Sequence, residues 1–353
     1  MQTSSRKFLI VLAGLILAGF VVYQSAQFIH KANFSGRELL HAVAGANLYL
    51  LLLSIIVIYT CYAVRALRWQ LFQGNLGSSR FWVIYKMTLA GFTAIFALGR
   101  PGEPVRPLLL ARKEKLPIAD MFGIYALERL FDFGATAVIG ALALILYQSH
   151  GYQAGMTSEL GSSIRKAGIV LLGGLGGGIL ALTYLRLHGS AELERRLQDS
   201  LKAHGWRSSL ARMLLGFVRG VQAIRTWSEL LLAIVYSAVH WFLVLLVYYW
   251  GSRSFGERLG TLSLGDVMLV MAFSLVGSVV QLPAVGGGAQ LASYLVYTKI
   301  FEVQPEPATA AAIVIWLIGF AVCSFAGVPL LIQEGLSLGK LREFAEHKKE
   351  ASG

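Results

Sequence analysis

Apolar residues gather in long runs along this chain, separated by short polar segments. About 20 consecutive apolar residues cross the hydrocarbon core of a bilayer as an α-helix. Several runs reach or approach that length. We predict that the following six cross a membrane: Phe8–Gln27, Asn47–Val64, Phe122–Tyr147, Ile169–Leu185, Leu230–Trp250 and Ala308–Leu331.

Two further apolar runs, Phe81–Leu98 and Val267–Leu282, lead into breaks rich in Pro and Gly. The first break reads Leu-Gly-Arg-Pro-Gly-Glu-Pro-Val-Arg-Pro over residues 98–107. The second reads Gln-Leu-Pro-Ala-Val-Gly-Gly-Gly-Ala-Gln over residues 281–290. Irregular backbone at membrane depth must be buried in protein or line a wet cavity, because hydrocarbon offers no hydrogen-bond partner. Paired breaks in two halves of a chain point to a transporter binding site; the alternative is two unrelated surface loops.

The positions of Lys and Arg predict the orientation of the crossings. Arg6 and Lys7 place the N-terminus in the cytoplasm. If Phe81–Leu98 crossed completely, the basic segment 100–115 would lie outside, against the positive-inside rule. A re-entrant hairpin that returns through Val105–Leu110 removes this conflict. The Arg-rich segment 188–227, the charged tail 336–353 and both termini are then cytoplasmic.

Helix, re-entrant hairpin and helix follow one another twice, at about 43–148 and again at about 229–332. The first copy enters from the cytoplasm and the second from outside, which is the arrangement of an inverted-topology repeat. We therefore predict an all-α polytopic membrane protein, with about six full crossings plus two re-entrant helical hairpins, in a single transmembrane domain over residues 1–335.

Composition supports this class and excludes others. The chain is 56% hydrophobic and 14% charged over 353 residues, with a net charge of +12. This balance leaves no room for a soluble enzyme domain. The basic residues lie in short loops, which favours contact with anionic lipids over nucleic acid. Cys61 and Cys323 lie in apolar runs and are interpreted as small hydrophobic residues. We read the first run as an uncleaved helix rather than a signal peptide.

Two groups of ionisable residues are the candidates for a binding site. Arg100, Glu103 and Arg106 fall within the first break, and Arg is suited to bidentate phosphate contacts. Further along, an otherwise apolar run carries Glu128, Arg129 and Asp132 near its start, with the two carboxylates on one helix face. Charges at such depth usually face a functional interior. The alternatives are a basic loop on the inner leaflet and a structural ion pair between helices.

Other polar residues favour structural roles. Arg65 and Arg68 close the second crossing, where snorkelling to the interface explains them. His240 beside Trp241 is interpreted as a packed hydrogen-bonding residue. An apolar stripe predicts an amphipathic helix on the inner leaflet; it consists of Leu210, Met213, Leu214, Phe217, Val218, Val221 and Ile224.

Three short patterns, in this order, resemble the lysylphosphatidylglycerol synthase transmembrane family, also called flippase-like. They are Gly102-Glu103-x-x-Arg106 after a broken helix, Glu128-Arg129-x-x-Asp132, and a Pro-x-x-Gly-Gly-Gly break that contains Gly286, Gly287 and Gly288. The resemblance covers about residues 8–335. It implies an inner-membrane protein that moves a lipid, or helps to move it, between leaflets. It does not imply synthase activity, because the soluble aminoacyl transferase domain of bifunctional members is absent. Family members often carry Glu where this chain has Gln290, a neutral amide.

These observations together predict a flippase of a bacterial inner membrane. It would move a phospholipid or polyprenyl-type lipid through a cavity between the two hairpins, using the two ionisable groups and the second break. The sequence contains no HExxH, GxSxG, P-loop or His-rich pattern, so we expect neither an enzyme nor a bound cofactor or metal. Two alternatives remain open: a non-transporting scaffold that recruits a lipid-modifying enzyme, and an intramembrane lipid transferase.

Overall fold

The computed structural model describes residues 41, 43–77, 80–149, 173, 176–177, 195, 197, 206–279, 281–282 and 286–335. The predicted first crossing, Phe8–Gln27, and the charged tail lie outside these residues. So do most of the predicted crossing Ile169–Leu185 and the first part of the basic segment 188–227.

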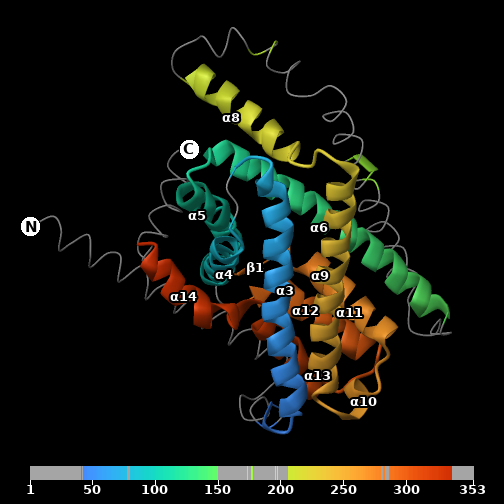
Figure 1. The fold of residues 1–353 in the computed structure, drawn as a ribbon. Helices are drawn as coiled ribbons and strands as arrows, with labels where there is room; N and C mark the ends of the chain where they lie inside the picture. The colour runs from blue at the N-terminus through green and yellow to red at the C-terminus, as the bar shows by residue number, and fades with distance from the viewer. Residues whose placement is uncertain are drawn as a thin grey trace, which may run out of the picture.

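The described chain is almost entirely helical (Figure 1). Its α-helices are α3 (Leu48–Gly74), α4 (Phe81–Leu98), α5 (Val105–Glu114), α6 (Ile118–Ser149), α8 (Trp206–Val221), α9 (Trp227–Arg253), α10 (Glu257–Gly260), α11 (Leu264–Gly277), α12 (Gly288–Lys299), α13 (Pro305–Trp316) and α14 (Cys323–Gln333). A 3₁₀ turn, η1, covers Arg100–Gly102, and a π turn, η2, joins α13 to α14 over Leu317–Ala321. Two two-residue strands, β1 (Gln281–Leu282) and β2 (Gly286–Gly287), pair antiparallel.

In the described part of the chain, four helical stretches are long and apolar enough to cross a membrane: Leu48–Gly74, Phe81–Leu98, Trp227–Arg253 and Pro305–Gln333. The predicted class, an all-α polytopic membrane protein, is therefore confirmed.

Helices α3 and α9 form an antiparallel pair at the centre of the molecule (Figure 1). Both ends of the pair are tied. Asn75, which follows α3, donates from Nδ2 to Glu229 Oε1 near the start of α9 at 2.9 Å. At the other end, the Asn47 N–H donates to the Ser254 carbonyl at 2.7 Å. Asn47 and Glu229 also cap the helices: Asn47 Oδ1 accepts from the Tyr49 N–H, and Glu229 forms a capping box with Thr226.

Each predicted break is the tip of a helical hairpin. In the first, α4 and α5 lie side by side across η1, and a Cβ on Gly102 would lie 2.2 Å from the Ala94 carbonyl oxygen. In the second, α11 and α12 lie side by side across β1 and β2, and a Cβ on Gly277 would lie 2.2 Å from the Gly288 carbonyl oxygen. Glycine is required at both positions, because the backbones approach too closely for any side chain.

The two hairpin tips contact each other at an exposed arginine. Arg100 in the first tip donates from Nη2 to the carbonyl oxygen of Ser278, the residue after α11, at 2.8 Å. The predicted spatial pairing of the two breaks is therefore present in the fold. Whether the hairpins are re-entrant in a bilayer stays a prediction, which this meeting of the tips supports.

Contacts between helices also occur in matched pairs. The contact of α4 with α14 corresponds to the contact of α11 with α6. In the same way, the contact of α4 with α3 corresponds to that of α11 with α9. The contact of α5 with α6 corresponds to that of α12 with α13. Together with the antiparallel α3–α9 pair, this is the contact pattern that an inverted repeat requires.

The π turn η2 leaves carbonyl groups outside the regular helical hydrogen-bond pattern. Helix α3 supplies donors for them. Tyr59 donates from its hydroxyl to the Val322 carbonyl at 2.8 Å, and Tyr62 donates to the Gly319 carbonyl at 2.5 Å. The irregular part of this span is therefore hydrogen-bonded to a neighbouring helix rather than exposed.

Helix α8 differs from its prediction. It packs closely on the start of α6, where Gly220 approaches the Asp120 carbonyl and Gly216 approaches Ala119. Of the predicted apolar stripe, Val218 is buried, whereas Leu210 and Leu214 are exposed. The stripe is thus divided between protein packing and an outer face, because the glycines place a second face of α8 against α6.

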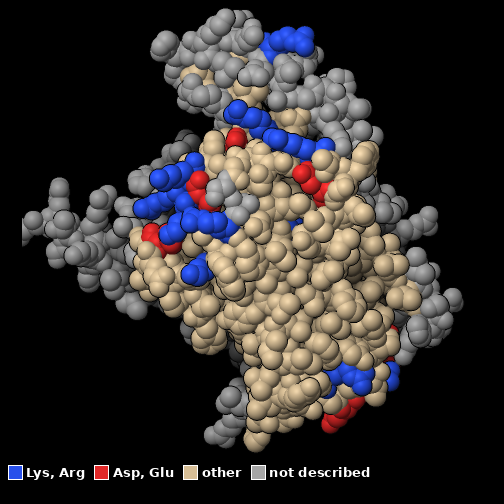
Figure 2. All heavy atoms as spheres, in the orientation of Figure 1, with Lys and Arg blue, Asp and Glu red and all other residues tan. Residues whose placement is uncertain are grey.

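On the face that Figure 2 shows, charged side chains gather mainly at one end. The exposed basic residues near the end of α3, on α5 and α8 and in the turn before α9 are Arg80, Arg112, Lys113, Arg219 and Arg225. A broad surface without charge separates them from a smaller charged group near α10 (Figure 2). This distribution is typical of a membrane protein with one strongly basic face.

The close approach at the second hairpin tip predicts that Gly277→Ala lowers the stability of the protein by about 1–3 kcal/mol, because the new methyl group meets backbone. Thermal unfolding in detergent measures the change. Gly140→Ala in α6 is the control, since a Cβ there has nothing within 4 Å. It should be neutral or stabilising by about 0.5–1 kcal/mol. Equal losses for both variants would contradict the packing described here.

The inverted arrangement predicts that single cysteines at exposed positions Arg112 and Glu306 react from opposite sides of the membrane with an impermeant maleimide. The first position lies on the returning arm of the first hairpin and the second at the start of α13. Native Cys61 and Cys323 are buried and should stay unlabelled. Labelling of both introduced cysteines from one side would rule out the inverted repeat.

Candidate functional site

Helix α6 carries two carboxylates into the interior of the protein. Glu128 and Asp132 lie one turn apart on the same face, and both are buried, Glu128 completely. From the first residue of α6, Ile118, they lie about 15 Å and about 21 Å along the helix at 1.5 Å per residue. Their predicted common face is confirmed, and both side chains lie in the protein interior.

Two arginines of α3 contact these carboxylates. Arg65 Nε lies 2.8 Å from Glu128 Oε1, and the Nη2 of Arg65 pairs with Asp132 Oδ2. Arg68 Nη2 lies 2.7 Å from Asp132 Oδ1 and 3.2 Å from Glu128 Oε1. Arg68 also donates from Nη1 to Ser237 Oγ of α9 at 2.8 Å. The carboxylates thus join α3 to α6, and Arg68 extends the network to α9.

The first hairpin contributes a third arginine. Arg106 on α5 pairs through Nη2 with Glu128 Oε2, and its guanidinium lies over the Trp69 ring at 4.4 Å from the centroid. Gly91 in the facing helix α4 makes room for it, because a Cβ there would lie 2.6 Å from Arg106 Cβ. Arg106 therefore connects the hairpin to the carboxylates of α6.

Arg129 completes the set, and its Nη2 lies 2.8 Å from Asp132 Oδ2. We call these residues the arginine cluster: Arg65, Arg68, Arg106 and Arg129 with Glu128 and Asp132. All are buried except Arg129, whose side chain is 30% exposed. Arg129 is therefore the side of the cluster that a ligand can reach first in this conformation.

A row of polar contacts leads from the arginine cluster to the meeting point of the hairpins. The Arg129 guanidinium lies 5.2 Å from the Tyr125 ring centroid, and the Tyr125 hydroxyl donates to Glu103 Oε2. Glu103 Oε1 in turn lies 2.5 Å from Arg100 Nη1. Arg100 then reaches the Ser278 carbonyl of the second hairpin. Tyr125 thus connects the arginine cluster to the more exposed pair of Arg100 and Glu103.

The structure brings together most of the predicted site. Arg106, Glu128, Arg129 and Asp132 are in direct contact. Arg100 and Glu103 form an ion pair at the outer end of the polar row.

The second break supplies backbone rather than charge to this region. Gly286 and Gly287 form β2, and Gly288 begins α12. Gln290 is buried, and its Oε1 accepts from the Gly287 N–H at 2.6 Å, which caps α12. A role of these residues in contacting a ligand stays a prediction.

The snorkelling interpretation of Arg65 and Arg68 is wrong. The second crossing does not end at Val64, because α3 continues to Gly74 through Trp69 and Phe72, which are buried. Both arginines therefore lie within the helix and cannot reach the interface. The sequence does contain a signal for this pairing. Arg65 and Arg68 are three residues apart and so share a face of α3, as Glu128 and Asp132 share a face of α6. Tyr125 and Ser237 carried no such signal, because hydroxyl groups are common in apolar helices.

His240 of α9 is packed as predicted. Its Nδ1 lies 3.0 Å from Cys61 Sγ on α3, and both side chains are buried. Cys323 is buried as well. Over the described residues, no group of His, Cys, Asp and Glu could hold a metal ion.

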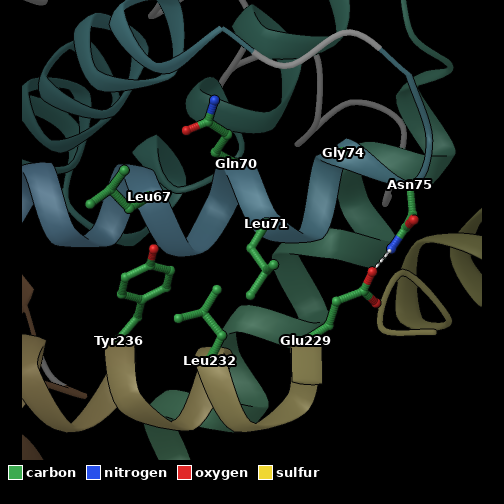
Figure 3. Close-up of a pocket in the computed structure, with 8 residues that line it drawn as sticks. All are labelled: Leu67, Gln70, Leu71, Gly74, Asn75, Glu229, Leu232 and Tyr236. Carbon is green, nitrogen blue, oxygen red and sulfur yellow. Dashed lines mark hydrogen bonds between the residues drawn. The ribbon is translucent and has the colours of Figure 1, made fainter. Parts of the chain in front are cut away.

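A separate groove of about 330 Å³ lies where α3 and α9 meet near the basic face (Figure 3). Leu67, Leu71, Leu232 and Tyr236 line its apolar part. The hydrogen bond between Asn75 and Glu229 closes its polar end. The groove contains no residue of the arginine cluster.

The buried ion pairs predict a large difference between two Glu→Gln variants. Glu128→Gln removes a charge that three helices share and should cost about 3–5 kcal/mol of stability. Glu334→Gln breaks only the more exposed pair with Lys113 and should cost about 0–1 kcal/mol. Thermal unfolding in detergent measures both. Similar losses in the two variants would show that the cluster does not hold the helices together.

Comparison with known proteins agrees with this architecture. The family model described as the lysylphosphatidylglycerol synthase TM region matches residues 10–327. That range contains both hairpins and the whole arginine cluster. No curated protein and no solved structure matches the chain. Because the family model covers most of the 353 residues, the chain belongs to the lysylphosphatidylglycerol synthase transmembrane family.

Proposed function

We propose that this protein moves a phosphate-bearing lipid, a phospholipid or a polyprenyl-type lipid, between the leaflets of a bacterial inner membrane. The observation that carries the proposal is the arginine cluster, which brings four guanidinium groups together beside the meeting point of two helical hairpins. Membership of a lipid-related membrane family supports the same direction.

Guanidinium groups suit a phosphate head group, because each offers a planar pair of N–H donors to two oxygens. In this conformation Glu128 and Asp132 occupy the arginines. A phosphate that enters beside Arg129 would compete with these carboxylates and exchange one set of charge-assisted hydrogen bonds for another. Such an exchange replaces one anionic partner of an arginine with another, so that the guanidinium groups keep anionic contacts while the head group moves.

The polar row offers a route for the head group. Arg129, Tyr125, Glu103 and Arg100 lie in succession between the arginine cluster and the second hairpin. For the head group to leave on the opposite side, the hairpins must separate at Arg100 and Ser278. The α3–α9 pair is tied at both ends and provides the stationary part against which they move. Alternating access by rocking of repeats works in this way.

Reconstitution into vesicles tests the proposal. Fluorescent lipids with phosphate-containing head groups should become accessible to an impermeant quencher faster than in protein-free vesicles. Arg106→Gln and Arg129→Gln should each slow this movement by about tenfold or more, because each removes a charge-assisted contact. Arg112→Gln, an exposed arginine on the same helix as Arg106, is the control and should leave the rate unchanged.

The result also separates the alternatives. If no lipid moves faster than in protein-free vesicles, the proposal fails and a scaffold for a lipid-modifying enzyme becomes the better account. Conversion of a lipid by the purified protein in detergent would instead indicate an intramembrane transferase. Arg129→Gln matters most, because its partly exposed side chain can be changed without emptying a buried site.

A further inference from the structure

The charges of the arginine cluster do not balance. Four guanidinium groups share two carboxylates, so the cluster keeps two more positive than negative charges among the described residues. The neighbouring pair Arg100–Glu103 is balanced within itself and contributes nothing to this excess. His240 Nδ1 is hydrogen-bonded to the Cys61 thiol rather than to a carboxylate, so this contact adds no negative charge to the cluster.

Burial makes this excess costly unless a ligand compensates for it. The other contacts of the arginines are neutral: the hydroxyl of Ser237 and the ring faces of Trp69, Phe92 and Tyr125. Aromatic faces attract a cation but do not cancel its charge. The protein environment therefore stabilises the arginines only in part.

Donor groups are also left over. The Nε atoms of Arg68 and Arg129 are buried and have no hydrogen-bond partner. A buried N–H without an acceptor costs free energy, and an oxygen-rich ligand would supply the missing acceptors. Arg68 is fully buried and Arg129 lies at the exposed side, so the free donors occur at both depths of the cluster.

From these two observations, and resting on the proposed function, we infer that the arginine cluster takes a terminal phosphate monoester. A monoester carries about −1.5 to −2 charges at pH 7 and three free oxygens. It therefore matches the excess of two positive charges and the unfilled donors. A phosphodiester carries about one negative charge and leaves one positive charge uncompensated. A zwitterionic head group also brings its own positive charge to a site that already has an excess of positive charge.

Arg129 sets this preference, because it is the partly exposed arginine of the cluster. Its removal reduces the excess from two to one and leaves the contacts of Glu128 with Arg65 and Arg106 in place. It is also the residue through which a ligand reaches the cluster. Arg112 on α5 is exposed and lies outside the cluster, which makes it the matched control.

Lipid binding to the purified full-length protein in detergent tests the inference. Native mass spectrometry would compare dioleoyl lipids with the same chains: phosphatidic acid, phosphatidylglycerol and phosphatidylcholine. We expect the monoester, phosphatidic acid, to bind about tenfold more tightly than phosphatidylglycerol, and phosphatidylcholine to bind most weakly. Arg129→Gln should reduce the preference for the monoester to about threefold or less, whereas Arg112→Gln should retain it.

Equal affinity for the monoester and the diester, or a preference that Arg129→Gln leaves intact, would overturn the inference. A competition experiment tests whether the bound phosphate comes from a lipid or from solution: inorganic phosphate is added at the concentrations used for the lipids. Weak competition supports a lipid head group, and competition as strong as that of phosphatidic acid would assign the site to soluble phosphate and overturn the lipid assignment.

The transport assay separates the two proposals. Faster movement of the diester than of the monoester would leave the flippase proposal standing and overturn this inference. A clear monoester preference in binding, with no movement of any lipid, would support this inference while the flippase proposal fails.

Discussion

Glu128 holds the centre of this protein together. Its two carboxylate oxygens contact arginines from α3 and from the first hairpin, while Asp132 one turn away contacts the same α3 arginines. Apolar packing alone gives little preference for one helix arrangement in a bilayer, because lipid is as apolar as the side chains. Ion pairs at depth do give such a preference, since no other arrangement satisfies them. The position of the hairpin relative to α3 and α6 thus depends on one glutamate.

Glycines make that arrangement geometrically possible. Gly91 lets Arg106 pass close to α4, and Gly102 and Gly277 let each hairpin turn back on itself. Small residues at helix contacts are the usual means of close packing in membranes. Here they serve a second purpose, because they bring charged groups of different helices within hydrogen-bonding distance. Packing and electrostatics are therefore set by the same few positions.

Much of this architecture can be predicted from the sequence, for identifiable reasons. Apolar runs and Pro/Gly breaks are local signals, so the helices and both hairpins are visible in the chain. Glu128 and Asp132 stand out because carboxylates are rare in apolar segments. The roles of Arg65 and Arg68 were missed because a helix end was placed at the first charge. An arginine is equally compatible with an interface and with a buried pair until its partner is known. The contact between Arg100 and Ser278 joins residues distant in sequence and has no local signature.

The π turn η2 has a consequence for how the α3 tyrosines should be understood. Tyr59 and Tyr62 lie among apolar and aromatic neighbours, and their rings suggest simple space-filling. Their hydroxyls, however, donate to backbone carbonyls in the π turn and at the residue that follows it. A phenylalanine would fill the same volume but would remove the hydrogen bonds that join α3 to this irregular span. The chemical identity of these positions is thus set by the backbone of a different helix, which is a constraint on the sequence that does not depend on any bound ligand.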